Sequence, residues 1–244
     1  MAKKEENLRY ASMTAAAEDC REGQTLRPRG LVLTLLGAES TGKTTIAYTL
    51  ERVLRAQGVR CVVVAEYLRE FCETHHRTPT REEQHTIAEI QAERIETAME
   101  TFELVIADTS PLMTAVYSEL VFGDRSLYAD ALDWQGRMTV TAHASQGLFR
   151  GQADLQKAAP TILLMGLDLP WVADGIQRDG PQFRPMVDRL IRNHLEAACL
   201  PYAVIEGSGT QRIYATLQRL QDITPSLVSL ISAAWSSVCA PSKP

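Results

Sequence analysis

The sequence predicts an α/β fold with a five-stranded parallel sheet and helices on both of its faces. Short apolar runs recur along the chain, and segments whose apolar residues have helical spacing separate them. This alternation is typical of strand–helix–strand crossovers, in which neighbouring strands run parallel. The predicted strands are residues 31–36, 59–65, 104–107, 161–165 and 202–205.

A glycine-rich loop follows the first apolar run. Residues 37–45 read GAESTGKTT and match the pattern G-x-x-x-x-G-K-[ST]. After the loop, Ile46, Leu50, Val53 and Leu54 recur at helical spacing. A strand, a glycine loop and a helix in this order form a cradle for nucleotide phosphates, so we predict a P-loop NTPase fold.

The loop residues suit this chemistry position by position. Gly37 and Gly42 permit backbone angles and close approach that a Cβ would obstruct, and the loop N–H groups then converge on a phosphate at the start of a helix. Lys43 carries a mobile charge to the phosphates, and the Thr44 hydroxyl is a suitable Mg²⁺ ligand. The alternative is a glycine-rich turn with an exposed lysine. We predict ATP and Mg²⁺ as cofactors, with a nucleotide site formed by Gly37, Ser40, Thr41, Gly42, Lys43, Thr44 and Thr45.

Two further helix starts are readable in the sequence. Residues 80–83 read TREE after Pro79, a capping-box pattern that predicts a helix running to about Glu100. Pro111 follows Ser110, and proline suits the first turn of a helix. Residues 129–158 show no clean period, and we expect short helices and loops in an insertion there.

We predict three parts for the chain. Residues 1–29 are expected to form an N-terminal arm, residues 30–222 the P-loop kinase domain with the insertion at 129–158, and residues 223–244 a C-terminal tail.

Composition excludes several classes of protein. The chain has 244 residues and a net charge of −5, which gives no global attraction to nucleic acid or to an anionic membrane. Its five cysteines are scattered without a C-x-x-C pair, so no zinc site or disulfide framework is indicated. No apolar run is long enough to span a bilayer. We expect a cytoplasmic protein that binds a small-molecule nucleoside, with no nucleic-acid or membrane partner.

Asp108 directly follows the third apolar run. A carboxylate there lies at the carboxyl edge of the sheet, where open α/β sheets bind ligands, so Asp108 is a candidate for organising Mg²⁺ and for catalysis. The alternative is an N-cap of the next helix. Thr109 follows instead of glutamate, which argues against the Asp-Glu pair of motor-type ATPases.

Glu66 follows the second apolar run in the same way. A carboxylate there can orient or deprotonate a substrate hydroxyl. Tyr67 could stack on a flat ring, and Arg69 could pair with a carboxylate or phosphate. Gln91 could point toward substrate from the helix that follows. Solvated charges at an ordinary turn, and plain packing for Gln91, are the alternatives.

A turn-rich segment, residues 166–180, follows the fourth apolar run and reads GLDLPWVADGIQRDG. Such a loop can close over a phosphate, deliver arginine charge to the transition state and exclude water. We expect Arg178 to be catalytic and Trp171 and Asp174 to contact substrate, with Arg184 as a second lid arginine. A polar surface loop followed by a charged helix is the alternative.

These segments together resemble the ribosylnicotinamide kinase domain of NadR-type proteins, over about residues 31–220 without much of 129–158. The resemblance implies a P-loop NTPase fold of the nucleoside-kinase-like kind. It also implies a kinase that transfers the γ-phosphate of ATP to the 5′-hydroxyl of nicotinamide riboside. It further implies that Lys43 and Thr44 hold phosphates and Mg²⁺ and that Asp108 serves the reaction centre. By the same resemblance, Trp171, Asp174 and Arg178 belong to the lid and the substrate side. The shared motifs are GAESTGKTT from Gly37, AEYLRE from Ala65, the helix at 87–91, ADTSPLMTAVY from Ala107 and LPWVADG from Leu169.

Three departures from this family pattern are visible. The nucleotidyl-transfer motif that precedes the kinase in bifunctional members is missing, so we expect a kinase-only form without adenylyltransferase or DNA-binding activity. The acidic pattern D-T-D reads Asp108-Thr109-Ser110, so one carboxylate is missing. The predicted insertion at 129–158 would lie where it can reshape the acceptor pocket.

We therefore predict an ATP-dependent small-molecule kinase that acts on the 5′-hydroxyl of a nucleoside, with nicotinamide riboside first among the acceptors. The alternative is a P-loop ATP-binding regulatory or sensor protein with slow ATPase activity. A GTPase is disfavoured because the chain has no N-K-x-D guanine-reading motif.

Overall fold

The computed structural model describes residues 30–144, 159–172 and 180–224 of the chain. The predicted N-terminal arm and nearly all of the predicted C-terminal tail lie outside these residues. The division of the chain into three parts stays a prediction.

The predicted five-stranded parallel sheet is confirmed, with the strand order β2-β3-β1-β4-β5. Three strands have the predicted bounds, whereas β2 is shorter than the predicted 59–65 and β4 begins one residue later than predicted. A turn shortens β2, since the Cys61 N–H donates to the Val59 carbonyl at 3.0 Å. The strands are β1 Leu31–Leu36, β2 Cys61–Val64, β3 Leu104–Ala107, β4 Ile162–Met165 and β5 Tyr202–Ile205.

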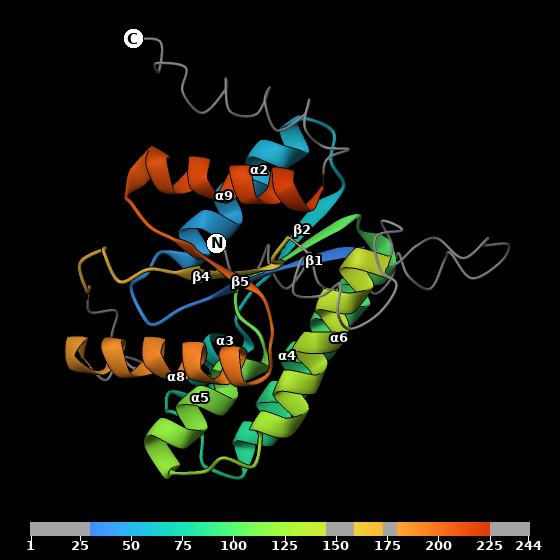
Figure 1. The fold of residues 1–244 in the computed structure, drawn as a ribbon. Helices are drawn as coiled ribbons and strands as arrows, with labels where there is room; N and C mark the ends of the chain where they lie inside the picture. Colours follow the sequence, from blue (N-terminus) through green and yellow to red (C-terminus); the bar gives the residue numbers. More distant parts are fainter. Residues whose placement is uncertain (1–29, 145–158, 173–179, 225–244) are drawn as a thin grey trace, which may run out of the picture.

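Helices cover both faces of the sheet, as Figure 1 shows. On one face lie α2 (Lys43–Ala56) and α9 (Gly209–Ile223), and on the other lie α4, α5, α6 and α8. Alternate residues of β1 serve the two cores: Leu33 packs with α2 and α9, whereas Val32 packs with α4 and α6. The other helices are α3 Tyr67–His75, α4 Glu83–Thr101, α5 Pro111–Phe122, α6 Tyr128–Ala144 and α8 Arg184–Ala197, with a short 3₁₀ turn at Pro181–Phe183.

The two predicted helix starts are close to the observed ones. Pro111 is the first residue of α5. The helix α4 begins at Glu83, whose carboxylate accepts the Thr80 N–H at 2.8 Å, so the half of the capping box that the glutamate provides is formed. Arg77 holds the same carboxylate with two bonds of 2.7 Å each.

The expectation of short helices and loops is wrong for residues 129–144, which belong to the single 17-residue helix α6. Trp134 and Met138 of α6 are buried against the sheet, and the Trp134 indole N–H donates to Glu96 at 2.8 Å. The helix was hard to recognise from apolar spacing because one of its buried positions is polar. Gln135 is buried and donates to the Thr34 hydroxyl of β1 at 3.2 Å. Residues 145–158 lie outside the described chain.

Over the described ranges, no helix combines the length and the apolar character that crossing a membrane requires.

Candidate functional site

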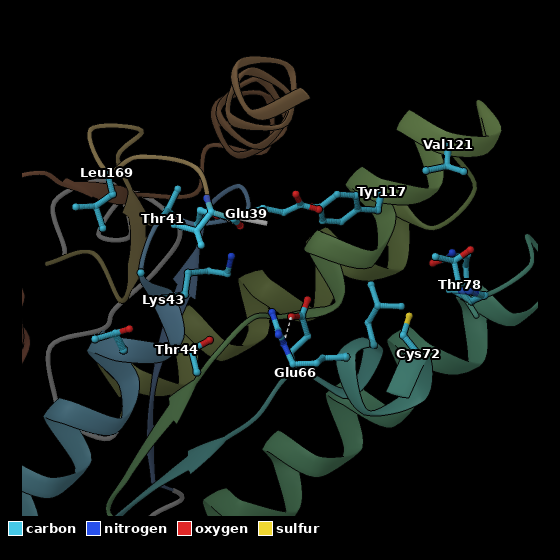
Figure 2. A pocket seen from close by; sticks show the side chains of 18 of the residues that line it. Glu39, Thr41, Lys43, Thr44, Glu66, Cys72, Thr78, Tyr117, Val121 and Leu169 are labelled. Carbon is cyan, nitrogen blue, oxygen red and sulfur yellow. Dashed lines mark hydrogen bonds and ion pairs between the residues drawn. The ribbon is translucent and has the colours of Figure 1, made fainter. Parts of the chain in front are cut away.

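A pocket of about 570 Å³ opens at the carboxyl edge of the sheet, next to the β1–α2 loop (Figure 2). Six of the predicted nucleotide-site residues line it, together with Glu66 and Arg69. Figure 2 shows the loop residues Thr41, Lys43 and Thr44 at one end, Glu66 between, and Cys72, Thr78 and Val121 at the other end. The loop residues that line it are Ser40, Thr41, Gly42, Lys43, Thr44 and Thr45.

Both glycines of the loop are needed for its shape. Gly37 has φ 146° and Gly42 has φ 81°, values that L-residues rarely adopt. A Cβ on Gly37 would lie 3.0 Å from the Met165 carbonyl oxygen, and one on Gly42 would lie 3.1 Å from Leu169 Cδ1. The loop is therefore folded against the end of β4 and the segment that follows it.

The Lys43 side chain folds back over the loop. Its Nζ donates to the carbonyl oxygens of Gly37 at 2.7 Å and Ala38 at 3.1 Å, and the Thr41 hydroxyl donates to Ala38 at 2.8 Å. Thr44 and Thr45 are exposed in the first turn of α2. The ammonium group thus lies over the cradle where phosphate oxygens can replace the loop carbonyls as its partners.

Ser40 ties the loop to the segment after β4. It has φ 55°, and its Oγ accepts the Val172 N–H at 3.0 Å and donates to the Val172 carbonyl at 3.2 Å. Leu169, Pro170 and Val172 line the pocket beside the loop. The beginning of the predicted lid therefore rests on the phosphate-binding loop.

Asp108 lies at the end of β3, beside the central strand β1, and is only 3% exposed. Burial raises the pKa of its carboxyl group, whereas the Lys43 charge, a Thr44 hydrogen bond and the Arg69 charge act to lower it. Its Oδ1 is buried without a hydrogen-bond partner within the described residues. Since the N-cap of α5 is Ser110, Asp108 is not the cap that the alternative reading required.

The residues around Asp108 fit a Mg²⁺ ion by the chemistry of their donors. An unsatisfied carboxylate oxygen and the Thr44 hydroxyl that bonds to the same carboxyl group are hard oxygen ligands of the type that Mg²⁺ prefers. Thr109 has φ 118°, a backbone angle that is an outlier for a β-branched residue. Strain of this kind concentrates at functional sites. Among the described residues, Asp108 and its surroundings included, no group of three or more His, Cys, Asp or Glu side chains is arranged to hold a metal ion.

Glu66 and Arg69 face the pocket from the turn and first residues of α3. Glu66 Oε2 lies 3.9 Å from Arg69 Nε, and the Arg69 charge also reaches Asp108. The structure thus brings Lys43, Thr44, Glu66, Arg69 and Asp108 near one another, and their catalytic and binding roles stay predictions.

Three predicted substrate residues lie off the pocket wall. Tyr67, Gln91 and Trp171 are not among the described residues that line it. The Tyr67 N–H donates to Gln91 Oε1 at 2.8 Å, and the Arg94 guanidinium lies 4.5 Å from the centre of the Tyr67 ring. Tyr67 and Gln91 therefore brace α3 against α4 in this structure, and their contact with a substrate stays a prediction, as does that of Trp171.

The predicted catalytic Arg178 and the predicted substrate residue Asp174 lie outside the described residues. Arg184, the second lid candidate, is 8% exposed and donates to the Leu167 carbonyl at 3.4 Å.

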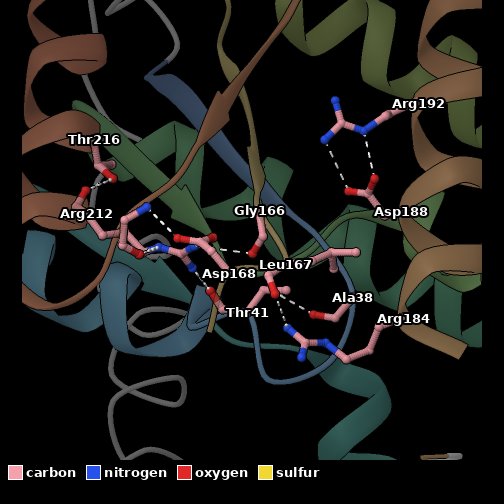
Figure 3. Close-up of polar contacts among 11 residues, drawn as sticks. Ala38, Thr41, Gly166, Leu167, Asp168, Arg184, Asp188, Arg192, Arg212 and Thr216 are labelled. Atoms are coloured by element: carbon pink, nitrogen blue, oxygen red, sulfur yellow. Dashed lines mark hydrogen bonds and ion pairs between the residues drawn. The ribbon is translucent and has the colours of Figure 1, made fainter. Parts of the chain in front are cut away.

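Sequence reasoning missed Arg212 of α9. Its side chain is 2% exposed and donates to the carbonyl oxygens of Thr41, Gly166 and Gly207 and to the Asp168 carboxylate (Figure 3). One guanidinium therefore joins the phosphate-binding loop to the ends of β4 and β5. No local pattern signals this role, because its partners are mostly backbone carbonyls.

Sequence reasoning also missed the far end of the pocket. Residues of α3, the α3–α4 loop, the start of α4 and the last turns of α5 form it. In the sequence, Tyr117 and Phe122 read as ordinary apolar positions of a helix. The residues are Leu68, Cys72, Thr78, Pro79, Gln84, Tyr117, Val121 and Phe122.

Comparisons with known proteins agree with this geometry. A family model described as an AAA domain (AAA_28) matches residues 32–212, which is most of the chain. No curated protein matches the sequence.

Two similar solved structures are crystal structures of NadR protein, one in complex with NR and one in complex with NAD and AMP-PNP. The first has a TM-score of 0.56 and covers 80% of this chain and 51% of the NadR chain. The second has a TM-score of 0.51 and covers 80% and 50%. Sequence identity is 16% in both cases, so the likeness shows the fold. This chain spans about half the length of the NadR chains that it matches.

Proposed function

Because the chain belongs to the AAA domain family and has a P-loop NTPase-like fold, we propose that it is an ATP-dependent phosphotransferase acting on the 5′-hydroxyl of a nucleoside. Nicotinamide riboside is the first acceptor to test, since the sequence motifs resemble the ribosylnicotinamide kinase domain. The observation that carries the proposal is the pocket itself. It continues from the phosphate-binding loop past Glu66 to a second end, which is the layout that two substrates require.

The donor half of the reaction belongs to the loop. Its N–H groups and the Lys43 ammonium bind the phosphates, and positioning of this kind supplies most of the catalysis of phosphoryl transfer. Thr44 and Asp108 would hold Mg²⁺, which neutralises phosphate charge when bound. Arg212 keeps the loop in shape through the Thr41 carbonyl.

The acceptor half begins at Glu66. Its carboxylate lines the pocket between the loop and the far end, so it is placed to accept a hydrogen bond from the attacking hydroxyl. Asp108 does not line the pocket and is nearly fully buried, which favours Glu66 as the residue that orients the hydroxyl. Arg69, beside Glu66, can supply charge to the transferring phosphoryl group.

A panel of nucleosides tests the proposal directly. The full chain, incubated with Mg·ATP, should release ADP in proportion to added nicotinamide riboside and form the 5′-monophosphate. Glu66→Gln should slow this transfer by about 10²–10⁴-fold, the contribution typical of a general acid or base, while the affinity for an ATP analogue stays unchanged.

A regulatory ATP-binding protein would behave differently. Its ADP release would be slow and equal with and without every nucleoside of the panel. That result would reject the kinase and support the sensor.

A further inference from the structure

The helix α3 carries two pocket residues at its start, although it is too short to be stable by itself. It spans nine residues, Tyr67–His75, and isolated helices of this length are unstable in water. Glu66 is its N-cap and lines the pocket, and its side chain makes no capping hydrogen bond to the helix. Arg69 lines the pocket from the first turn. The placement of both side chains therefore depends on what holds the start of α3.

Gln91 of α4 binds the first N–H group of α3. The helix itself cannot satisfy this group, and the Tyr67 N–H donates to Gln91 Oε1 at 2.8 Å. Gln91 is 2% exposed, and its Nε2 has no hydrogen-bond partner within the described residues. A buried donor without a partner is unfavourable, and an apolar side chain of the same size would avoid it. The amide oxygen is therefore the part of Gln91 that this position uses.

Arg94 binds the same turn of α3 from about one turn further along α4. Its guanidinium donates to both carboxylate oxygens of Glu70, at 2.6 and 3.1 Å, and lies 4.5 Å from the centre of the Tyr67 ring. The Arg94 side chain is 18% exposed, so water screens this ion pair only in part. Neither Gln91 nor Arg94 is among the described residues that line the pocket. They reach it only through α3.

The sheet fixes the helix from which these two side chains project. Ile95, Ala98 and Met99 of α4 are buried in one core cluster with residues of β1, β2 and β3. Ile95 directly follows Arg94 in the sequence. The start of α3 is therefore attached, through Gln91 and Arg94, to a helix that packs on the sheet.

We propose that Gln91 and Arg94 are positioning residues of the phosphotransferase, which hold the Glu66 carboxylate where it orients the acceptor hydroxyl. The inference rests on the proposed function and adds the residues through which Glu66 is fixed. A displacement of a reacting group by about 1 Å can lower a rate about 10²-fold. Contacts that do not touch the substrate therefore still determine turnover.

The other end of α3 provides a matched control. Arg77 donates to both carboxylate oxygens of Glu83, at 2.7 Å each, and lies 5.3 Å from the centre of the Phe71 ring. Arg94 makes the same combination of an ion pair and a ring contact, but next to Glu66. Arg94→Met and Arg77→Met therefore remove similar contacts at the two ends of one helix. Only the first should change kcat.

Turnover of nicotinamide riboside, or of the best acceptor in the panel, is measured for each variant alone and combined with Glu66→Gln. Gln91→Met and Arg94→Met should each lower kcat at least about tenfold, with the KM for ATP unchanged. Arg94→Lys keeps the charge and should retain more of the rate than Arg94→Met. Arg77→Met should lower the melting temperature and leave kcat unchanged. In the Glu66→Gln background, the losses from Gln91→Met and Arg94→Met should shrink to less than about twofold, because both residues act through Glu66.

Three results would overturn the inference. The first is an undiminished kcat in both Gln91→Met and Arg94→Met. The second is a loss that persists in full in the Glu66→Gln background, which would mean that the two residues act on another group. The third is an equal loss of kcat in Arg77→Met, which would mean that any weakening of α3 has the same effect.

Relaxation of ¹³C in the Glu66 side chain separates this inference from the kinase proposal, because the measurement needs no turnover. The order parameter of the side chain should fall in Gln91→Met and Arg94→Met and stay unchanged in Arg77→Met. If it does so while no nucleoside is phosphorylated, the positioning stands and the kinase proposal fails. If a nucleoside is phosphorylated while kcat and the order parameter are unchanged in both variants, the kinase stands and the positioning is wrong. If no nucleoside is phosphorylated and the order parameter does not change, both are wrong.

Discussion

At the scale of single residues, two positions that follow β3 differ from ordinary core residues: one is a buried carboxylate and the other has a strained backbone. Asp108 is almost fully buried, although the proposed Mg²⁺ site would use its charge, and Thr109 has φ 118°. Each strained backbone position of this kind costs of order 1–3 kcal/mol and persists only where the surroundings enforce it. The surroundings here are the central strands, so the carboxylate is held rigidly next to Lys43 and Thr44.

Asp108→Asn keeps the shape of this side chain and removes its charge. We expect at least about a hundredfold loss of turnover, the size typical of losing one electrostatic contact in a reaction centre, and a higher Mg²⁺ concentration for half-maximal rate. The melting temperature should not fall, because a buried charge no longer opposes folding. Steady-state rates across a Mg²⁺ series check this, and full activity at low Mg²⁺ would show that Asp108 does not organise the metal.

Lys43→Ala should abolish phosphate binding and leave the fold intact, because among the described residues its Nζ donates to carbonyl oxygens of the loop itself, those of Gly37 and Ala38. We expect turnover to fall by at least about 10³-fold, as for loss of a principal phosphate charge. Arg52→Ala, an exposed position on the same helix, is the control and should retain the rate. ADP release and circular dichroism together measure the two effects. A Lys43→Ala variant as active as the Arg52→Ala control would contradict the site.

At the scale of elements, the helix α9 contacts the phosphate-binding loop although the two are far apart in the sequence. Arg212 donates from α9 to Thr41, which is 171 positions away in the sequence. The same guanidinium bonds to the Asp168 carboxylate, whose own second oxygen accepts the Gly207 N–H. These hydrogen bonds therefore hold the loop and the ends of β4 and β5 together.

Arg212→Lys keeps the charge but cannot reach the same oxygens, because a single ammonium replaces a planar fork of donors. We expect a loss of about 2 kcal/mol in the free energy of unfolding, together with weaker binding of AMP-PNP. Denaturant titration of Arg212→Lys, Asp168→Asn and the double variant should give a coupling of about 1 kcal/mol. Strict additivity of the two changes would mean that the pair does not act together.

The contacts at the start of α4 make the stability of the protein depend on pH. Hydrogen bonds from Arg77 and then from the Thr80 N–H hold the pKa of the Glu83 carboxyl group at about 2, below its usual value of 4.5. A depressed pKa means that the stabilising contribution is complete above about pH 4.5 and is lost as the pH falls toward 2.

Glu83→Gln should therefore lower the melting temperature at neutral pH, and the difference from the unmodified chain should shrink as the pH falls from 4.5 to 2. Glu82→Gln, an exposed neighbour just before α4, is the control and should show a smaller difference at neutral pH. Melting curves across this pH range check the sign. A difference that grows toward acid would exclude the proposed contribution of Glu83.

At the scale of the whole molecule, the sequence predicted the sheet, the glycine loop that lines one end of the pocket, and Glu66 and Arg69 beside it, but not the far end of the pocket. Strands buried on both faces read as apolar runs, so Leu31–Leu36 and Leu104–Ala107 were predicted at their observed bounds. The glycine loop is local and has a distinctive spacing. Tyr117 could not be separated from core residues, because the sequence does not show that a pocket lined by α3 and α5 lies beside it. Tyr67 looked like a stacking residue, but Arg94 lies over its ring.

A nucleotide that binds only the folded chain should stabilise the whole molecule. At a free concentration of about 100 times its Kd, Mg·AMP-PNP should add about 2.7 kcal/mol to the free energy of unfolding. For a chain of this length that corresponds to a rise in melting temperature of about 5–10 °C. Scanning calorimetry measures it, with Lys43→Ala as the variant that should show no rise. The absence of any rise in the unmodified chain would contradict nucleotide binding.

The strand order has a consequence for how acceptor preference could diverge or be redesigned. Because β2 and β3 lie together on one side of β1, the chain builds that side in one excursion, residues 61–122, before it returns to β4. Most of the far-end residues and Glu66 belong to that excursion, whereas the phosphate-binding loop precedes it and Arg212 follows it. Under the proposed function, the residues that select the acceptor therefore lie in one continuous segment of the sequence. Exchanging residues 61–122 between relatives would therefore move the acceptor residues together with Asp108, while the phosphate-binding loop and Arg212 stay in place.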